Sequence, residues 1–512
     1  MRLLTYRLVL LFLALLFFSA LPVKANVKVN PLFGDNAVLQ RRKPIAVWGT
    51  AEPDEVVVVK LQNTCTNTTA DKSGNWMVHL PAFEAGGPYC LTVKGKNRLV
   101  FHNVYVGEVW LCSGQSNMVM PVSYAKDSKK DIEQSNNPNL HLFWVQENLS
   151  KAPGTDLNAS WQLANPETVR EFSAVAYYFG RALQKTARMP VGIIFSAYPG
   201  TAIKVWMSNE SITASRDTVQ LDPPPDFQEQ REKFDKEMQE WKLKVREARD
   251  KGLDEPAMPV LTGDFYANSS GFNGMINPIV PYSLRGVAWY QGEADFQAPE
   301  KWRHLFAYMI DDWRQRWRDP TLPFVYVQVP GHGKKLDRPA ESHWAQLRES
   351  QLMARRIPYA YMVCTIDSSV SDDINLHPRE KREVGERIAQ VALGCVYKCA
   401  VPFSGPIYDS MNVVGNKVEL TFRYADGGLI SKDGKLQGFT IAGVDKTFLP
   451  AQSRIEGNEV VVWSDKVPKP VAVRYSWAPN PDGNLYNKNN LPAPPFRTDR
   501  WIAHFSKNKA DI

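Results

Sequence analysis

The chain has 512 residues, of which 44% are hydrophobic and 22% charged, and its formal net charge is +7. This length exceeds what a single hydrophobic core organises, so two or three domains are expected. The composition excludes a disordered or fibrous protein, and the small positive charge is not gathered along one face as in a nucleic-acid-binding protein.

The N-terminus, residues 1–25, has the pattern of a signal peptide. Arg2 and Arg7 form a positive start, an uncharged and mostly apolar stretch follows, and Val23 and Ala25 are small residues at the cleavage positions. The apolar stretch is shorter than the ~20 residues of a membrane-spanning helix, so no membrane anchor is expected after cleavage. Cleavage removes three cations and no acid, which lowers the net charge from +7 to +4. The pattern predicts a secreted or periplasmic protein.

Residues 26–103 have the pattern of a small β-sandwich. Residues 56–61 are rich in β-branched side chains, and glycine-containing pairs at 74–75, 86–87 and 95–96 mark turns. We expect an N-terminal β domain over this range.

Residues 104–400 alternate between short apolar runs and helical segments. The apolar runs are typical of parallel strands covered on both faces; they are 109–112, 192–196, 286–290, 324–329 and 360–366. The clearest helical segments are 174–187, 302–317 and 382–393. We therefore expect an α/β fold with a central parallel sheet and helices on both faces.

Polar or glycine-rich segments follow these strands directly. They are 113–117, 199–201, 291–293, 330–332 and 367–369. Ligands of open α/β sheets bind beyond the carboxyl ends of the strands, so the segments predict a functional site at that edge.

An insertion at about 213–265 interrupts the alternation. Within 227–250, Phe234, Met238 and Trp241 belong to one apolar stripe of an amphipathic helix, with Asp226 as its N-cap. Two interpretations remain open: a helix packed on the α/β domain, or a lid near the active site.

Residues 401–512 again read as short strands, near 417–422, 459–463 and 471–475, and predict a C-terminal β domain.

Six cysteines in an exported chain permit disulfides. Cys65 and Cys90 lie in one β region and could pair, whereas Cys395 and Cys399 could pair or stay free. Cysteine and histidine follow no zinc-binding spacing, so no metal site is expected.

Ser116 is the candidate nucleophile because it follows a strand directly, in a turn that Gly114 permits. A serine needs a neighbouring base to lose its proton. His377 follows the last predicted strand and precedes a helix, which places it at the same sheet edge as Ser116. His332, in another loop, is the second choice. The remaining histidines lie in outer β regions, in a helix or in no predicted site segment: His79, His102, His141, His304, His343 and His504.

Four ordered motifs resemble those of the sialate O-acetylesterase family, in the SGNH-hydrolase superfamily. They are Gly-Gln-Ser-Asn-Met at 114–118, Phe-Asn-Gly-Met-Ile at 272–276, Trp-Tyr-Gln-Gly-Glu at 289–293 and Leu-His-Pro at 376–378. Weaker likeness at 32–40 and 484–499 extends the resemblance over nearly the whole mature chain.

The resemblance implies a role for each residue of the site. Ser116 is the nucleophile and His377 the base. The oxyanion hole consists of the N–H groups of Ser116 and Gly200 and the side-chain amide of Gln291. Trp206 and Glu293 are candidate substrate contacts.

The chain departs from the family pattern at two places. Pro199 replaces a glycine before Gly200, and the residue three before His377 is Ile374 rather than Asp. We expect Asp373 to orient His377. A Ser–His dyad, or Asp367 as the acid, remains an alternative.

The resemblance also implies the reaction, which is hydrolysis of acetyl esters on a carbohydrate without metal or organic cofactor. Two alternatives remain. One is an esterase of the same mechanism acting on acetylated xylan or another glycan, and the other is a carbohydrate-binding protein whose esterase centre is inert.

Overall fold

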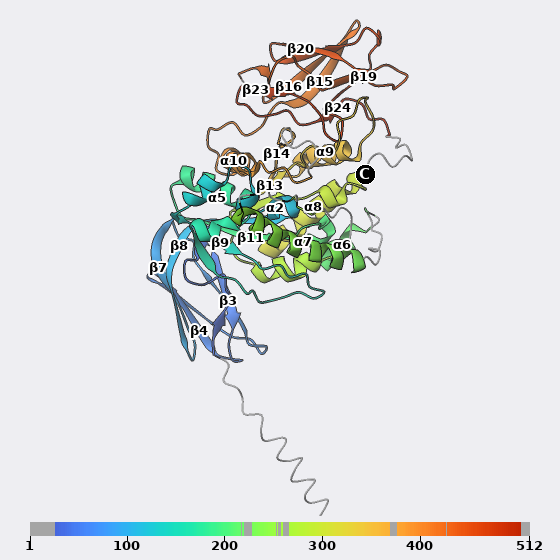
Figure 1. Ribbon diagram of the computed structural model, residues 1–512. Helices are drawn as coiled ribbons and strands as arrows, with labels where there is room; N and C mark the ends of the chain where they lie inside the picture. The colour runs from blue at the N-terminus through green and yellow to red at the C-terminus, as the bar shows by residue number, and fades with distance from the viewer. Residues whose placement is uncertain are drawn as a thin grey trace, which may run out of the picture.

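The structure is a computed structural model that describes residues 26–216, 218–219, 228–251, 253, 256, 258–259, 266–368, 376–425 and 427–502. The expected signal peptide and Asp373 lie outside these residues. Figure 1 shows three parts stacked in chain order: a β region, a layered α/β region and a second β region.

The N-terminal part is built from short strands that alternate between buried and exposed side chains. Its strands are β1 (Lys28–Val29), β2 (Val38–Gln40), β3 (Ile45–Thr50), β4 (Val56–Leu61), β5 (Thr64–Thr69), β6 (Asn75–Leu80) and β7 (Gly86–Lys94). β1, β3 and β6 form one sheet, and β5, β4 and β7 continue into β8. In β6, Trp76, Val78 and Leu80 are buried while the residues between them are exposed, which is the period of a strand with one face on the core.

One long strand joins the N-terminal part to the centre. β8 (Arg98–Gly114) has 17 residues. Its first half pairs with β7, and its second half lies between two strands of the central sheet. The domain boundary expected between residues 103 and 104 lies inside this strand.

The central sheet has the strand order β10-β9-β11-β8-β12-β13-β14. The strands not yet given are β9 (Asn137–Trp144), β10 (Trp161–Ala164), β11 (Val191–Ala197), β12 (Gly286–Tyr290), β13 (Phe324–Val327) and β14 (Ala360–Val363). Neighbours from β9 to β14 are parallel, but β10 pairs with β9 in the antiparallel direction. The expectation of a parallel sheet is therefore corrected to a mixed sheet with an antiparallel edge.

Helices cover both faces of this sheet, because alternate residues of each strand point to opposite sides. On β8, Val109 and Leu111 join a core with α8 (Pro299–Trp317), α9 (His343–Met353) and the N-terminal strands. Trp110 and Cys112 join the opposite core, with α5 (Ala174–Ala187) and α10 (Lys381–Val391). Each large apolar side chain that is fully buried in this way stabilises the fold by about 1.5–3 kcal/mol.

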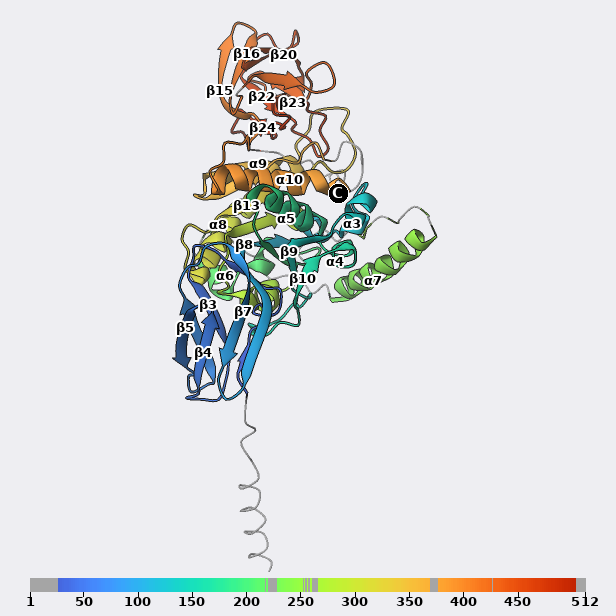
Figure 2. The same ribbon diagram turned by 90° about the vertical axis from the view of Figure 1, so that its left-hand side faces the viewer.

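The inserted segment forms helix α7 (Gln228–Asp250), which extends along the outside of the central part (Figure 2). Its stripe of Phe234, Met238, Trp241 and Val245 is buried against Met120, Tyr124 and Met258. The structure thus has a helix packed on the α/β part, against the segment that follows Ser116. The shorter helices are α2 (Ser116–Val119), α3 (Lys129–Glu133), α4 (Pro166–Arg170) and α6 (Asn209–Ser215).

The C-terminal part consists of small antiparallel sheets around its own core. Its strands are β15 (Ile407–Val414), β16 (Lys417–Arg423), β17 (Leu429–Ser431), β18 (Phe439–Ala442), β19 (Leu449–Pro450), β20 (Gln452–Glu456), β21 (Glu459–Trp463), β22 (Ala472–Tyr475), β23 (Leu485–Asn487) and β24 (Phe496–Arg497).

All six cysteines have free thiols. Cys65 lies on β5 and Cys90 on β7, and both strands pair with β4 from opposite sides. Two strand spacings, about 9.6 Å, exceed the Cα separation that a disulfide can span. The possible Cys65–Cys90 bridge is therefore absent.

The part of the chain that the structure describes has neither a membrane-spanning helix nor a cluster of metal-binding side chains. None of the helices there has both the length and the apolar character needed to cross a membrane. The same residues hold no group of three or more histidine, cysteine, aspartate or glutamate side chains arranged to bind a metal ion.

Candidate active site

Three loops meet at the carboxyl edge of the central sheet. Gly114 at the end of β8 is in register with Ala197 of β11 on one side and Tyr290 of β12 on the other. The segments that carry Ser116, Gly200 and Gln291 therefore leave neighbouring strands at the same level. Residues far apart in the chain converge for this reason.

The turn before Ser116 requires glycine at position 114. Gly114 has φ +143°, and a Cβ there would lie 2.0 Å from the carbonyl oxygen of Tyr290. The side chain of Gln115 then fastens the turn, because its Oε1 accepts hydrogen bonds of 3.3 Å from the N–H groups of Gly292 and Ala294. Ser116 begins α2, where a backbone N–H has no partner within the helix.

Ser116 and His377 are in direct contact. The Oγ of Ser116 lies 2.8 Å from the Nε2 of His377, and the two residues are 4% and 1% exposed. Burial, and to a lesser extent the positive charges of Lys381 and His332, lower the pKa of His377 to about 3. The imidazole is therefore neutral at rest and can accept a proton from the serine.

A buried network holds the loop of His377 against the serine turn. The Nδ2 of Asn117 donates to the backbone oxygen of Leu376, at 3.0 Å, and to the Oε1 of Glu293, at 2.5 Å. The Nζ of Lys381 donates to the Oδ1 of Asn117, at 2.5 Å. Asn117 thus joins the residues after the nucleophile to the residue before the base.

Glu293 is a buried carboxyl group within this network. Burial raises its pKa, and hydrogen bonds from its own backbone N–H and from Asn117 offset part of that rise. Sequence analysis placed Glu293 among the candidate substrate contacts; the structure places it behind the nucleophile, in contact with Asn117.

Gln291 secures the turn that contains Gly200, which has φ +70°. Its Nε2 donates to the backbone oxygen of Thr201, at 3.1 Å, and to the Oδ2 of Asp295, at 2.5 Å. Its Oε1 accepts from the indole N–H of Trp302, at 3.0 Å. Since a primary amide has two N–H bonds, both donors of Gln291 are used within the protein.

Trp206 lies in the core below the same turn. Its ring is fully buried against Trp289, and its indole N–H donates to the Oγ1 of Thr201, at 2.9 Å. It supports the turn and presents no free face.

The other candidates are held by contacts of their own, although the charge of His332 also acts on His377. The ring of His332 packs edge-on against Trp344, and its backbone N–H donates to Pro479. Both carboxylate oxygens of Asp367 accept 2.7 Å hydrogen bonds from Arg387, and Tyr486 donates to one of them. Asp367 is therefore committed to an ion pair.

Sequence reasoning missed Gln115, Asn117 and Lys381. The first two stand in the Gly-Gln-Ser-Asn motif, so their position beside Ser116 was a usable signal. Lys381 gave none, because it reaches Asn117 from 264 residues away in the chain.

The chain is similar to known carbohydrate esterases over most of its length. A model of the family described as carbohydrate esterase, sialic acid-specific acetylesterase, matches residues 106–221 and 267–394. The chain is 28% identical to the sialate O-acetylesterase of Mus musculus over 90% of this chain and 92% of that protein. It is 26% identical to the human sialate O-acetylesterase over 92% of this chain and 93% of that protein.

Among solved structures, a carbohydrate acetylesterase from Xanthomonas citri is 34% identical, with a TM-score of 0.80. The match covers 93% of this chain and 100% of that one, so it includes the outer β regions as well as the central sheet. The chain therefore belongs to the family of carbohydrate esterases described as sialic acid-specific acetylesterases.

Proposed function

We propose that this chain is a carbohydrate O-acetylesterase of the SGNH type that works through a serine nucleophile. The observation that carries the proposal is the 2.8 Å contact between the Oγ of Ser116 and the Nε2 of His377 at the carboxyl edge of the sheet. Nucleophile and base must lie within hydrogen-bond reach, about 2.6–3.2 Å, for the serine to be activated.

The reaction proceeds in two steps. The Oγ of Ser116 attacks the acetyl carbonyl carbon while its proton moves to the Nε2 of His377. The tetrahedral intermediate collapses, the bond to the sugar oxygen breaks, and His377 gives the proton to that oxygen. Water, activated by the same histidine, then hydrolyses the acetyl-serine and releases acetate.

The oxyanion binds to the backbone N–H groups of Ser116 and Gly200, each worth about 3 kcal/mol of transition-state stabilisation in comparable sites. Gln291 keeps Gly200 in position through Thr201. To donate directly to the oxyanion as well, its amide has to release either Thr201 or Asp295.

Asp373 is proposed to orient His377 and stabilise its charged form. A histidine that is buried beside Lys381 resists protonation, so the imidazolium formed during catalysis needs a nearby negative charge. Asp373→Asn is expected to lower kcat by several orders of magnitude, whereas the adjacent Asp372→Asn has a small effect. Values of kcat within about tenfold of wild type for both variants would favour a dyad.

The proposed substrates are acetyl esters of sialic acid. The likeness to mammalian sialate O-acetylesterases supports this choice, whereas the similar Xanthomonas protein is described only as a carbohydrate acetylesterase. Acetylated xylan is therefore the second candidate. Acetate release from 9-O-acetyl sialic acid and from acetylated xylan, measured side by side, decides between them.

Replacing Ser116 tests the mechanism. Ser116→Ala should reduce acetate release by at least about 10³-fold and leave the melting temperature unchanged. Ser410→Ala, the same change on a C-terminal strand, is the control. Residual activity near wild type in Ser116→Ala would contradict the assignment. A wild-type protein that binds acetylated sugars but releases no acetate would favour the inert binding protein.

We also propose that the protein is exported, because of the pattern in residues 1–25. N-terminal sequencing of the exported protein should begin at Asn26. A chain that retains Met1 would contradict export by cleavage.

A further inference from the structure

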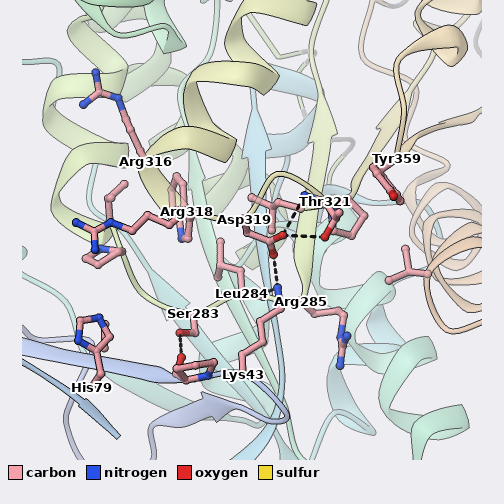
Figure 3. A pocket seen from close by; sticks show the side chains of 18 of the residues that line it. Lys43, His79, Ser283, Leu284, Arg285, Arg316, Arg318, Asp319, Thr321 and Tyr359 are labelled. Atoms are coloured by element: carbon pink, nitrogen blue, oxygen red, sulfur yellow. Dashed lines mark hydrogen bonds and ion pairs between the residues drawn. The ribbon is translucent and has the colours of Figure 1, made fainter. Parts of the chain in front are cut away.

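A groove of about 820 Å³ lies at the edge of the central sheet opposite to Ser116. It is formed where β12, β13 and β14 begin, between the end of α8 and the strands β3 and β6 of the N-terminal part (Figure 3). Its volume falls within the range of ligand-binding pockets, about 300–1,000 Å³. None of the residues assigned above to the active site lines it.

The walls of the groove are positively charged. The lining contains five cations, Lys43, Arg285, Arg316, Arg318 and Lys398, and one carboxylate, that of Asp319. Cations therefore outnumber carboxylates much more strongly in the lining than in the whole chain, which has 61 basic and 54 acidic residues.

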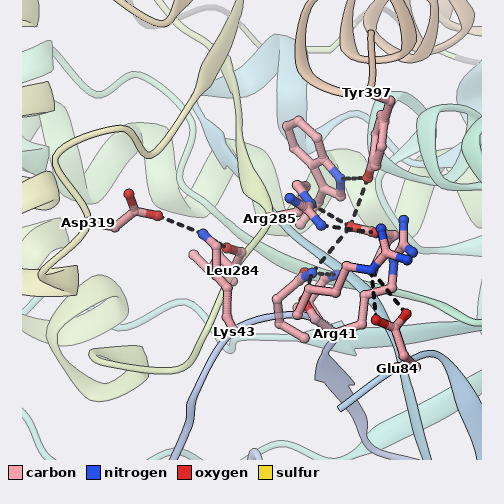
Figure 4. Close-up of polar contacts among 12 residues, drawn as sticks. Arg41, Lys43, Glu84, Leu284, Arg285, Asp319 and Tyr397 are labelled. Carbon is pink, nitrogen blue, oxygen red and sulfur yellow. Dashed lines mark hydrogen bonds and ion pairs between the residues drawn. The ribbon is translucent and has the colours of Figure 1, made fainter. Parts of the chain in front are cut away.

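Three of these cations are bound to carboxylates. The Nζ of Lys43 donates to Asp319 at 2.6 Å (Figure 3), and Arg285 is paired with the buried Glu108 (Figure 4). Arg316 is paired with Asp312. These pairs fix the walls in place. The shape of the groove is therefore set before any ligand binds, which reduces the entropy lost on binding.

Arg318 and Lys398 are different. Both are exposed, and neither forms an ion pair or a side-chain hydrogen bond within the part of the chain that the structure describes. They are available to an external anion. His79 is also exposed on the lining, and its ring nitrogens can hydrogen-bond to a ligand.

The same groove has exposed aromatic and apolar surface. Tyr359 is 46% and Met77 39% exposed, and both line the groove. Arg314 lies over the Tyr359 ring, 5.9 Å from its centroid, and the exposed part of the ring offers a flat surface for the C–H groups of a sugar. Simple inorganic anions need no such surface.

We propose that this groove is a second carbohydrate-binding site, which takes a carboxylate-bearing glycan chain. The carboxylates pair with Arg318 and Lys398, and a sugar ring packs on Tyr359. That the bound glycan is also the acetylated substrate rests on the proposed function. Binding of the glycan in the groove does not depend on the proposed function.

A site on the far side of the sheet changes how the enzyme meets its substrate. Once one part of a polymer is held, the acetyl groups on the rest of it are present at a high effective concentration. The groove should therefore lower KM for acetylated acidic polymers and leave KM for small esters unchanged.

Binding is measured with the full-length Ser116→Ala protein, so that no ester is consumed. Polysialic acid is the acidic glycan, dextran the neutral glycan and polyglutamate the acidic polymer without sugar. We expect binding to polysialic acid alone. Arg318→Gln combined with Lys398→Gln should weaken it by about tenfold, the equivalent of two exposed ion pairs. Lys466→Gln combined with Lys469→Gln, on exposed lysines of the C-terminal part, is the control of equal charge.

Two results would overturn the proposal. One is binding that the groove variant and the control variant weaken equally, because net charge then explains it. The other is equal binding of polyglutamate, because the groove then recognises charge without sugar. A Tyr359→Ala variant checks the stacking contact separately and should weaken binding of polysialic acid without changing binding of polyglutamate.

The kinetic arm separates this proposal from the esterase assignment. With Ser116 intact, the groove variant should raise KM for O-acetylated polysialic acid several-fold and leave kcat/KM for p-nitrophenyl acetate unchanged. An unchanged KM on the polymer contradicts the groove, whereas the absence of hydrolysis of either ester contradicts the proposed function.

Discussion

At the scale of single residues, the environment of His377 predicts an unusual pH dependence. The folded protein lowers the pKa of this histidine to about 3, by burial and by the charge of Lys381. The neutral, active form therefore persists well below the usual histidine pKa of about 6.5. The acidic limb of kcat/KM should lie clearly below pH 6.

Lys381→Met provides the matched test. Removing this cation favours the imidazolium, so the acidic limb should move to higher pH in the variant. A limb at or above pH 6.5 in the wild type, or a shift to lower pH in the variant, would show that another group governs the profile. The Arg379→Met variant, two residues away, controls for a general loss of charge.

Glu293 should position the base through Asn117 without touching the substrate. Glu293→Ala removes the acceptor that fixes the amide of Asn117, so kcat is expected to fall by about 10–100-fold while KM changes little. Glu293→Gln keeps an acceptor oxygen at the same distance and should restore most of kcat. Glu300→Ala, on the exposed start of α8, is the control. Loss of kcat in Glu293→Gln as large as in Glu293→Ala would point to a direct role of the charge.

At the scale of elements, α7 links the segments on both sides of the site. Its Trp241 packs edge-on against Tyr124, with ring centroids 5.2 Å apart, and donates to the backbone oxygen of Pro256. Its Asp235 accepts a 3.3 Å hydrogen bond from Tyr198, two residues before Gly200. The helix therefore supports the loops that follow both β8 and β11.

Trp241→Ala should detach this helix from the loops. Truncating a buried tryptophan costs about 3–5 kcal/mol of the packing free energy, so we expect a lower kcat and faster proteolysis within the insertion. Leu243→Ala, at a position 56% exposed on the same helix, should change neither. Full activity in Trp241→Ala would show that the helix is dispensable for the site.

At the scale of the molecule, Glu108 connects the N-terminal part to the central sheet (Figure 4). Its buried carboxylate is paired with Arg41 and Arg285 and accepts a 3.0 Å hydrogen bond from Tyr397. Burial raises the pKa of Glu108, but the two arginines outweigh burial and hold it below the usual range. Its stabilising contribution is present above the pKa of the unfolded chain, about 4.3, and is lost as pH falls through the lower folded value.

Glu108→Gln should lower the free energy of unfolding by about 3–5 kcal/mol at pH 7, because it leaves two arginines without their shared partner. The difference from wild type should shrink as pH falls below about 4. Thermal unfolding at pH 7 and pH 3 measures both effects. Glu84→Gln, an exposed partner of Arg42, should have almost no effect. Equal melting temperatures for Glu108→Gln and wild type at pH 7 would contradict the prediction.

The sequence predicted the buried strands of the central sheet because short continuous apolar runs are typical of strands that are covered on both faces. It did not reveal β9, whose first half contains Pro138 and asparagines, or the antiparallel direction of β10. The possible Cys65–Cys90 bridge is absent for a similar reason, because the order of strands in a sheet cannot be read from the sequence. That Cys65 and Cys90 belong to one β region does not show that β4 lies between their strands, β5 and β7.

Within the site, motif and position together predicted the contact of Ser116 with His377, which are 261 residues apart. The sequence did not predict which hydrogen bonds the side chains of the site form within the protein. The sequence shows an amide at Gln291 and a carboxyl group at Glu293. Only the fold shows that Gln291 donates to Thr201 and that Glu293 accepts from Asn117.

Strand β8 also has a mechanical consequence. At about 3.3 Å per residue, a strand of 17 residues spans at most roughly 56 Å, and β8 is irregular at Asn103, which has φ +55°. One end is clamped in the N-terminal sheet, and the other ends at Gly114, two residues before the nucleophile. Because one continuous backbone runs from the N-terminal sheet to the serine turn, we expect a rotation of the N-terminal sheet to shift Ser116, and a chimera with another N-terminal module to have a changed kcat.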